Sequence, residues 1–237
     1  MPCSASACAT CCCCPPYFDR SVTPEGIEDA FAAIVDGVAD DRLRASLYHI
    51  PQISGVAIPT TVAASLRKRY GKLVAGLKDS SGDFKQFQAF RTAAPELAIT
   101  VGNEADIARA IAAGGAGTIC GMANVAPELV KAMIDGKDVE ARMQAAIDVV
   151  VKTPSFLATL KAILAAQTGD AAWLRVRPPL RALSDGTASK RKLDELMAPA
   201  RRVKSRNVAT SRRGFRAQRV AIGARAILDC CSASIRA

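Results

Sequence analysis

Short apolar runs alternate with amphipathic segments along the chain from residue 43 onward. Four apolar runs predict strands, at residues 43–50, 73–78, 97–101 and 117–120. After each run, apolar residues recur at helical spacing and predict helices at residues 59–72, 83–94, 104–114 and 126–136. Continuous apolar strands that alternate with amphipathic helices indicate a parallel sheet covered by helices, so the predicted fold class is α/β.

Further helices are predicted on both sides of this alternation, at residues 23–39, 140–152 and 156–169. A doubly wound sheet and a (β/α)₈ barrel both fit the pattern. In both folds, ligands bind at the C-terminal ends of the strands. The first candidates for a site therefore lie at or near the predicted strand ends: Tyr48, Lys78, Asn103 and Cys120.

The charge of the chain is concentrated at its C-terminal end. The 237 residues carry a formal net charge of +10, and residues 187–237 account for all of it, with 13 Lys or Arg against 3 Asp or Glu. This segment lacks amphipathic order and predicts a basic, disordered tail. Its charge is sufficient for non-specific binding to nucleic acid or an acidic surface. Its single aromatic residue, Phe215, does not support stacking on bases, so we do not expect nucleic-acid binding.

Six of the nine cysteines lie in the first 14 residues, and four of them are consecutive, from Cys11 to Cys14. An uninterrupted run lacks the turns between ligand pairs that a zinc site needs, and it does not resemble a disulfide framework. The body of the chain has one cysteine, Cys120, which is typical of a cytoplasmic protein. No apolar run has the length of a membrane span, and no phosphate-binding glycine motif or Walker lysine is present. We therefore expect no membrane association, no cofactor and no metal.

The single histidine, His49, follows Tyr48 in a predicted strand. Neighbouring side chains of a strand point to opposite faces, so if Tyr48 faces a barrel interior, His49 faces the helices. This predicts a packed or hydrogen-bonded structural histidine. Without a second histidine, Ser-His-Asp and histidine–metal mechanisms are poorly supported.

Lys78 and Tyr48 suit carbonyl chemistry. An amine held among apolar strands loses the solvation of its charged form, and a neutral amine can attack a carbonyl to form a Schiff base. A tyrosine at the neighbouring strand end can shuttle the proton that this reaction needs. Taken alone, a lysine after an apolar run is also typical of a solvated strand end, and the spacing leaves both interpretations open.

Three linked segments distinguish these interpretations: LYHIPQISGVAIP from Leu47, VAGLKDSSGD from Val74, and VGNEADIARAIAAGGAGTICGMANVAPELV from Val101. Their order, spacing and residue types resemble the dihydrodipicolinate synthase/N-acetylneuraminate lyase family over residues 15–186. The resemblance implies a (β/α)₈ TIM barrel with C-terminal helices, usually assembled as a homo-oligomer. It also implies a class I aldolase or lyase whose small-molecule partner is pyruvate or a related 2-oxo acid.

The same resemblance implies roles for four residues of this chain. Lys78 matches the Schiff-base lysine, and Tyr48 matches the tyrosine that relays protons and contacts the substrate. Ile119 matches a position whose backbone lies beside the bound 2-oxo acid. Gly102 matches the glycine that helps to line the pocket after the seventh family strand.

The resemblance also implies an N-terminally truncated barrel, with equivalents of the fifth to eighth family strands. The threonine loop that holds the substrate carboxylate has no match, so we expect reduced activity. The expected units are an anomalous Cys-rich segment at 1–14, a partial barrel at 15–138, a C-terminal helical region at 139–186 and the basic tail at 187–237.

Half a barrel leaves the edges of the fifth and eighth strands unpaired, which predicts aggregation or pairing with another half-barrel. Two alternatives remain open: a non-catalytic remnant that docks on full-length paralogues, and a binding role for the basic tail.

Overall fold

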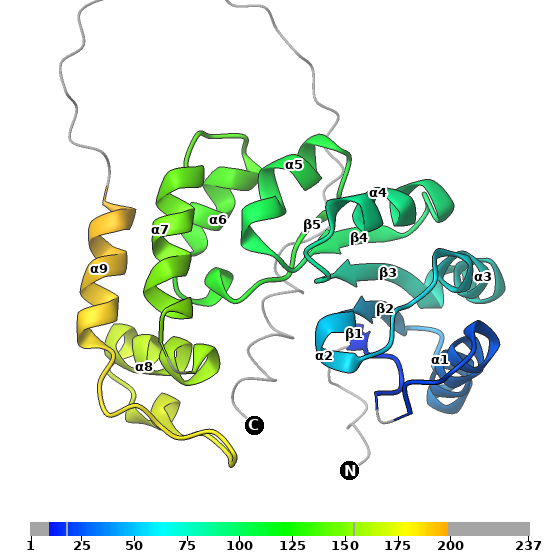
Figure 1. Ribbon diagram of the computed structural model, residues 1–237, viewed down its shortest axis with the longest axis horizontal. Helices are drawn as coiled ribbons and strands as arrows, with labels where there is room; N and C mark the ends of the chain where they lie inside the picture. The colour runs from blue at the N-terminus through cyan, green and yellow to red at the C-terminus, as the bar shows by residue number, and fades with distance from the viewer. Residues whose placement is uncertain (1–9, 18, 154, 199–237) are drawn as a thin grey trace, which may run out of the picture.

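The computed structural model describes residues 10–17, 19–153 and 155–198 (Figure 1). Its centre is a parallel sheet in the order β1-β2-β3-β4-β5, formed by β1 (Thr10–Cys13), β2 (Arg44–His49), β3 (Val74–Asp79), β4 (Ala98–Val101) and β5 (Gly117–Thr118). Between and after the strands lie α1 (Pro24–Val38), α2 (Pro51–Ser54), α3 (Thr60–Tyr70), α4 (Phe84–Ala93), α5 (Ile107–Ala112), α6 (Pro127–Ile134), α7 (Glu140–Val151), α8 (Phe156–Thr168) and α9 (Thr187–Met197). Short 3-10 turns complete the elements at η1 (Gly71–Leu73), η2 (Glu104–Asp106), η3 (Met122–Asn124) and η4 (Ala171–Leu174).

The strand-helix alternation confirms the α/β class and the partial-barrel architecture, because each strand is parallel to the one before it. The last strand is shorter than the predicted range 117–120, although the Ile119 amide still donates to the Val101 carbonyl oxygen at 3.0 Å. Helix α2 was not predicted. It begins at Pro51, which is well suited to a first helical position, and ends after one turn at Gly55, whose φ of 72° favours glycine.

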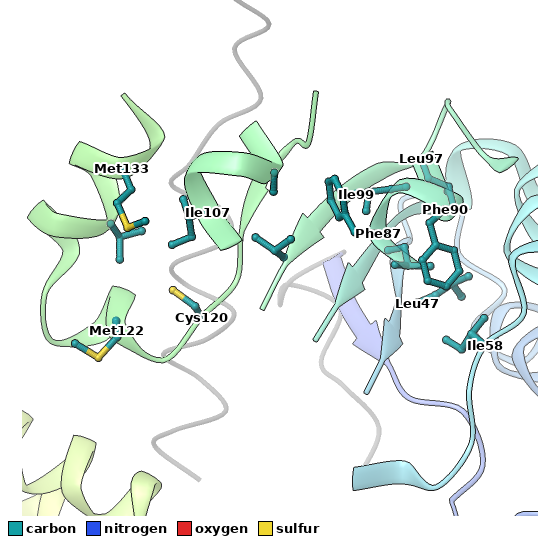
Figure 2. Packing of buried hydrophobic residues seen from close by; sticks show 14 of the residues in the cluster. Leu47, Ile58, Phe87, Phe90, Leu97, Ile99, Ile107, Cys120, Met122 and Met133 are labelled. Atoms are coloured by element: carbon teal, nitrogen blue, oxygen red, sulfur yellow. The ribbon is translucent and has the colours of Figure 1, made fainter. Parts of the chain in front are cut away.

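One face of the sheet packs against the helices and forms the core. On β2, Ala45, Leu47 and His49 are buried on this face, whereas Ser46 and Tyr48 alternate with them and are partly exposed. Figure 2 shows Leu47, Ile58, Phe87, Phe90, Leu97 and Ile99 gathered between the sheet and the helices on this side. The opposite face of β2 and β3 carries the candidate chemistry.

Helix α4 is anchored directly after the segment that contains Lys78. Asp83 is its N-cap residue, and its carboxylate accepts a hydrogen bond from the Lys85 amide at 2.9 Å. On the inner side of this helix, Phe87 and Phe90 are almost fully buried. The N-cap and the two buried rings together fix helix α4 directly after the loop that follows β3.

The sheet begins inside the segment 1–14 that we separated from the barrel. Thr10–Cys13 form β1 and pair in parallel with β2, with Cys13 opposite Leu47. The boundary at residue 15 is thus one strand too late. The strand predicted at residues 43–50, which the resemblance equates with the fifth family strand, is β2, and the prediction that its edge is unpaired is wrong. Cysteine is small, apolar and readily accommodated in a half-buried strand, which is why the run substitutes for ordinary strand residues.

The boundary at 187 also needs correction, because Thr187–Met197 form helix α9 rather than a disordered segment. Leu193 of this helix is fully buried, and the guanidinium of Arg142 in α7 donates to the Leu196 carbonyl oxygen at 2.7 Å. Figure 1 shows α9 lying beside α7 and α8. The rest of the predicted basic tail, residues 199–237, lies outside the described residues.

None of the helices within the described part of the chain is, by itself, long and apolar enough to cross a membrane. Helices α7 and α8 together would have the length and apolar composition of a membrane span. They meet at an angle of 105°, however, and do not form one straight helix.

Candidate active site

Tyr48 and Lys78 are neighbours at the C-terminal ends of β2 and β3. The register places Tyr48 opposite Lys78, and strand alternation turns both side chains to the face away from the helices. The Lys78 Nζ lies 4.0 Å from the centroid of the Tyr48 ring. An ammonium group over an aromatic face is attracted by the ring quadrupole, so this contact holds the lysine at the strand ends.

His49 and Asp79 form the next pair in the same register, on the opposite face. His49 is 2% exposed; its Nδ1 accepts a hydrogen bond from the Ile58 amide at 3.1 Å, and its ring meets Phe90 edge-on at 5.1 Å. These contacts confirm a packed, hydrogen-bonded structural histidine. Burial lowers the pKa of His49, and nearby Asp79 partly offsets this effect.

Asp79 is 4% exposed, and its carboxylate accepts a hydrogen bond from the Ser81 amide at 2.9 Å. Burial raises the pKa of the Asp79 carboxyl, an effect opposed by the hydrogen bonds from Ser81 and by His49. The bond to Ser81 turns the chain sharply after Lys78, so Asp79 shapes the loop from the far side of the sheet.

Gly102 follows β4 and lies directly beside the lysine. Its amide donates to the Asp79 carbonyl oxygen at 2.7 Å. A Cβ at this position would overlap the Ser80 side chain and come within 3.2 Å of Lys78 Cε. Only glycine leaves room for Ser80 and the lysine stem together.

Ile119 continues the line of strand ends beyond β5. Its amide donates to the Val101 carbonyl oxygen, and the adjacent Thr118 Oγ1 donates to the same oxygen at 2.8 Å. These bonds fix the Ile119 backbone next to Gly102. The two positions predicted to line a substrate pocket are thereby brought together.

All four predicted site residues line one pocket with a volume of about 460 Å³. Asn103 and Cys120, the other candidates at strand ends, line it as well. The remaining lining residues come from loops, from α2, from η2 and from α8: Ile50, Gln52, Ser80, Ser81, Gly82, Glu104, Gly121 and Phe156. A volume of this size suits a small molecule.

Cys120 is a buried thiol at the wall of this pocket. Burial raises its pKa to about 11, and the Glu104 carboxylate contributes to this rise. Glu104 is held in place because its Oε1 accepts a hydrogen bond from the Met122 amide at 3.0 Å. A thiol with such a high pKa is a poor nucleophile at neutral pH, so Cys120 acts as a wall residue.

A model of the dihydrodipicolinate synthetase family matches residues 3–196 of the chain. The chain belongs to this family. An uncharacterized DapA-like lyase of Chloroflexus aurantiacus is 37% identical over 180 residues, which cover 72% of this chain and 58% of that protein. A 4-hydroxy-tetrahydrodipicolinate synthase of Methanopyrus kandleri is 33% identical over 121 residues, covering 51% of this chain and 39% of that enzyme.

Solved structures of the family share the fold. The dihydrodipicolinate synthase of Agrobacterium tumefaciens gives a TM-score of 0.66 at 30% identity, covering 77% of this chain and 63% of that chain. The sialic acid aldolase of Ruminococcus gnavus gives 0.67 at 26% identity, covering 78% of this chain and 65% of that chain. Both alignments span less than two thirds of the family member, as do those with the two curated relatives.

Several pocket residues were not predicted. Gln52 Nε2 donates to the Ser80 carbonyl oxygen at 2.6 Å and ties α2 to the loop after Lys78. Phe156 of α8 rests on Gly121, where a Cβ would lie 2.9 Å from the Phe156 Cε1 atom. Ser80 and Glu104 lie just after predicted strand ends, so the rule that ligands bind at the C-terminal ends of strands could have identified them. Nothing in the local sequence indicates that α8 returns to the pocket.

Among residues 10–17, 19–153 and 155–198, the structure contains no group of three or more His, Cys, Asp or Glu side chains that could hold a metal ion. The titratable groups that line the pocket are an amine, a phenol, a carboxylate and a thiol: Lys78, Tyr48, Glu104 and Cys120.

Proposed function

We propose that the chain is a class I lyase or aldolase that forms a Schiff base between Lys78 and pyruvate or a related 2-oxo acid. The observation that carries this proposal is the placement of the Lys78 Nζ 4.0 Å over the Tyr48 ring, at the wall of a pocket in a protein of this family. The relatives that are named as a dihydrodipicolinate synthase and a sialic acid aldolase support this class of reaction.

In the proposed reaction, the neutral amine of Lys78 attacks the carbonyl carbon of the 2-oxo acid. A carbon–nitrogen bond forms, and the carbonyl oxygen receives two protons, one that the amine loses and one from the Tyr48 hydroxyl, before it leaves as water and gives the protonated imine. The Tyr48 phenolate can then accept the next proton that the substrate releases. Loss of a proton from the adjacent carbon of the substrate then gives an enamine, which can form or release a carbon–carbon bond.

The positions around the lysine support a small, planar substrate. Gly102 leaves space next to Lys78 Cε, and Ile119 presents a fixed backbone on the next strand end. In the family that the chain resembles, a threonine loop is expected to hold the substrate carboxylate. The described residues contain no counterpart of this loop. We therefore expect imine formation to require more 2-oxo acid than in a family member that has this loop, with slow turnover.

Reductive trapping tests this function. The chain is incubated with pyruvate and borohydride, and the adduct is located by peptide mass spectrometry. We expect one reduced adduct, on Lys78, and no adduct in Lys78→Ala. Lys85→Ala is the matched control because Lys85 is exposed, lies seven residues away and does not line the pocket. Equal trapping in Lys78→Ala and the unmodified chain would refute the assignment.

We also infer self-association. Tyr17 is 72% exposed after β1, and Ile53 is 74% exposed in α2 after β2, so two large apolar side chains follow neighbouring strand ends. Parallel strands end at the same edge of a sheet, so both side chains lie toward one end of the sheet, where a second copy of the chain would cover them. Sedimentation velocity should show an oligomer that dissociates in Ile53→Ser, and a monomer in the unmodified chain would contradict the inference.

A further inference from the structure

The loop that follows β3 is held at both ends of one peptide unit. The Ser80 carbonyl oxygen accepts a hydrogen bond from Gln52 Nε2 at 2.6 Å. The amide of the same peptide unit, that of Ser81, donates to the Asp79 carboxylate at 2.9 Å. The preceding amide, that of Ser80, donates to the His49 carbonyl oxygen at 2.8 Å. The orientation of this peptide unit therefore depends on one side chain from the pocket, Gln52.

Gln52 reaches the loop from a rigid support. In the single turn of α2, the Ile53 and Ser54 amides donate to the Ile50 carbonyl oxygen at 3.0 and 2.9 Å. Ser54 is 5% exposed, and its hydroxyl donates to the Val56 carbonyl oxygen at 2.8 Å. Gln52 itself is exposed, so its side chain holds the loop without filling the core. A substitution of Gln52 should therefore change the loop and leave the packing of the core intact.

The held loop reaches the reactive lysine at Gly102. A Cβ on Gly102 would lie 2.9 Å from Ser80 Cβ and 3.2 Å from Lys78 Cε, so both side chains pack against the same glycine. Ser80 thus forms a wall beside the lysine stem that carries the amine to the Tyr48 ring. We propose that Gln52 is a positioning residue that acts through the Ser80 carbonyl oxygen and keeps the Lys78 amine over Tyr48. This inference rests on the proposed Schiff-base function.

A variant of the same shape tests the hydrogen bond. The carboxylate of Gln52→Glu cannot donate to the Ser80 carbonyl oxygen and is repelled by it. A displacement of about 1 Å between reacting groups can slow a reaction by about 10²-fold, so we expect the limiting rate of pyruvate trapping in the full-length chain at about pH 7.5 to fall by about tenfold. The half-saturating pyruvate concentration should change by less than about twofold, because Gln52 acts through the loop and does not bind the substrate. Gln88→Glu is the control, since Gln88 is exposed on α4 and does not line the pocket.

Acidification distinguishes positioning from a general loss of structure. Once protonated, the carboxyl introduced by Gln52→Glu can again donate to the Ser80 carbonyl oxygen. Glutamic acid titrates near about pH 4.3, and a hydrogen bond made by its neutral form raises this value. With cyanoborohydride as the reductant, the trapping rate of Gln52→Glu should recover at about pH 5 to within about twofold of the unmodified chain, whereas Gln52→Met should stay slow. The protonation of the other titratable pocket groups cancels in this ratio, because both chains contain Lys78, Tyr48, Glu104 and Cys120.

A measurement without a 2-oxo acid separates this inference from the proposed function. Formaldehyde and cyanoborohydride methylate lysine amines, and exposed Lys85 serves as the internal reference. Release of Lys78 from the Tyr48 ring should raise its labelling relative to Lys85 several-fold in Gln52→Met, while its trapping with pyruvate slows. If the unmodified chain forms no pyruvate adduct, the proposed function fails, and the labelling then decides by itself whether Gln52 holds Lys78. Unchanged labelling of Lys78 in Gln52→Met, or a slowed Gln52→Glu chain that does not recover near pH 5, would overturn the positioning role.

Discussion

Two residue pairs, one step apart along the same two strands, have opposite surroundings. Tyr48 and Lys78 face a pocket, whereas His49 and Asp79 are buried against the helices. Both pairs combine a ring with a charged group at the end of a parallel strand. The difference shows that the face of the strand, rather than the residue type, separates groups that can meet a substrate from groups that hold the fold.

The largest expected effect is on the helix-facing side. Phe90 is fully buried and meets the His49 ring edge-on. Phe90→Ala should lower the free energy of unfolding by about 3–5 kcal/mol, through lost transfer energy and the cavity that remains. Phe156→Ala is the matched control at the pocket, where the ring is 42% exposed, and should cost about 1–2 kcal/mol in urea unfolding. Equal losses would remove the distinction between the faces.

The next effect is on the pocket side, at Gly102. A Cβ there would overlap Ser80 and approach Lys78 Cε, so Gly102→Ala should cost about 1–3 kcal/mol and reduce trapping at Lys78. Ser80→Gly removes the overlapping atoms. In a double-mutant cycle, the Gly102→Ala/Ser80→Gly protein should therefore be more stable than the two single effects predict; simple additivity would contradict the packing explanation.

A smaller effect concerns the pH dependence of stability. Burial lowers the pKa of His49 below its usual 6.5, so the unfolded chain takes up this proton at a higher pH than the folded chain. The stability contributed by neutral His49 is present above pH 6.5 and is lost as the pH falls toward the folded pKa. Asp79, whose pKa is raised by burial, contributes the opposite trend: the stability contributed by its neutral form is present below about pH 3.8 and is lost as the pH rises through the folded pKa.

His49→Asn isolates the histidine, because the amide oxygen can accept the Ile58 hydrogen bond but does not titrate. Between about pH 7 and about pH 5.5, the unmodified chain should lose more stability in urea unfolding than His49→Asn does. If the free energy of unfolding changed with pH in the same way in both proteins, protonation of a buried His49 would not be the cause of the loss.

The smallest effect is at the pocket wall. Burial, aided by the Glu104 carboxylate, raises the pKa of Cys120 to about 11, so Glu104→Gln should lower this pKa and speed alkylation of Cys120 by a few-fold. The glutamine oxygen can still accept the Met122 hydrogen bond. Glu96→Gln, at an exposed position, is the control and should leave the rate unchanged.

The pattern of the sequence was sufficient to predict the strands β2 to β5, most helices and the opposite orientations of Tyr48 and His49, because alternation and helical spacing are local. It failed at β1, where a cysteine run has no alternating hydrophobicity to reveal a strand. It also failed at α9, whose charged surface conceals a single buried anchor, Leu193. The contributions of Phe156 and Gln52 to the pocket depend on tertiary packing and had no local signal.

The most direct test of the contrast between the two faces is the rate of borohydride trapping with pyruvate in Tyr48→Phe and His49→Asn, each corrected for the folded fraction. Tyr48→Phe removes the proposed proton shuttle but keeps the ring beneath Lys78, so trapping at Lys78 should slow by about 10²-fold or more. His49→Asn should trap at the rate of the unmodified chain. Unchanged trapping in Tyr48→Phe, together with a loss in folded His49→Asn, would contradict the assignment of chemistry to the pocket face.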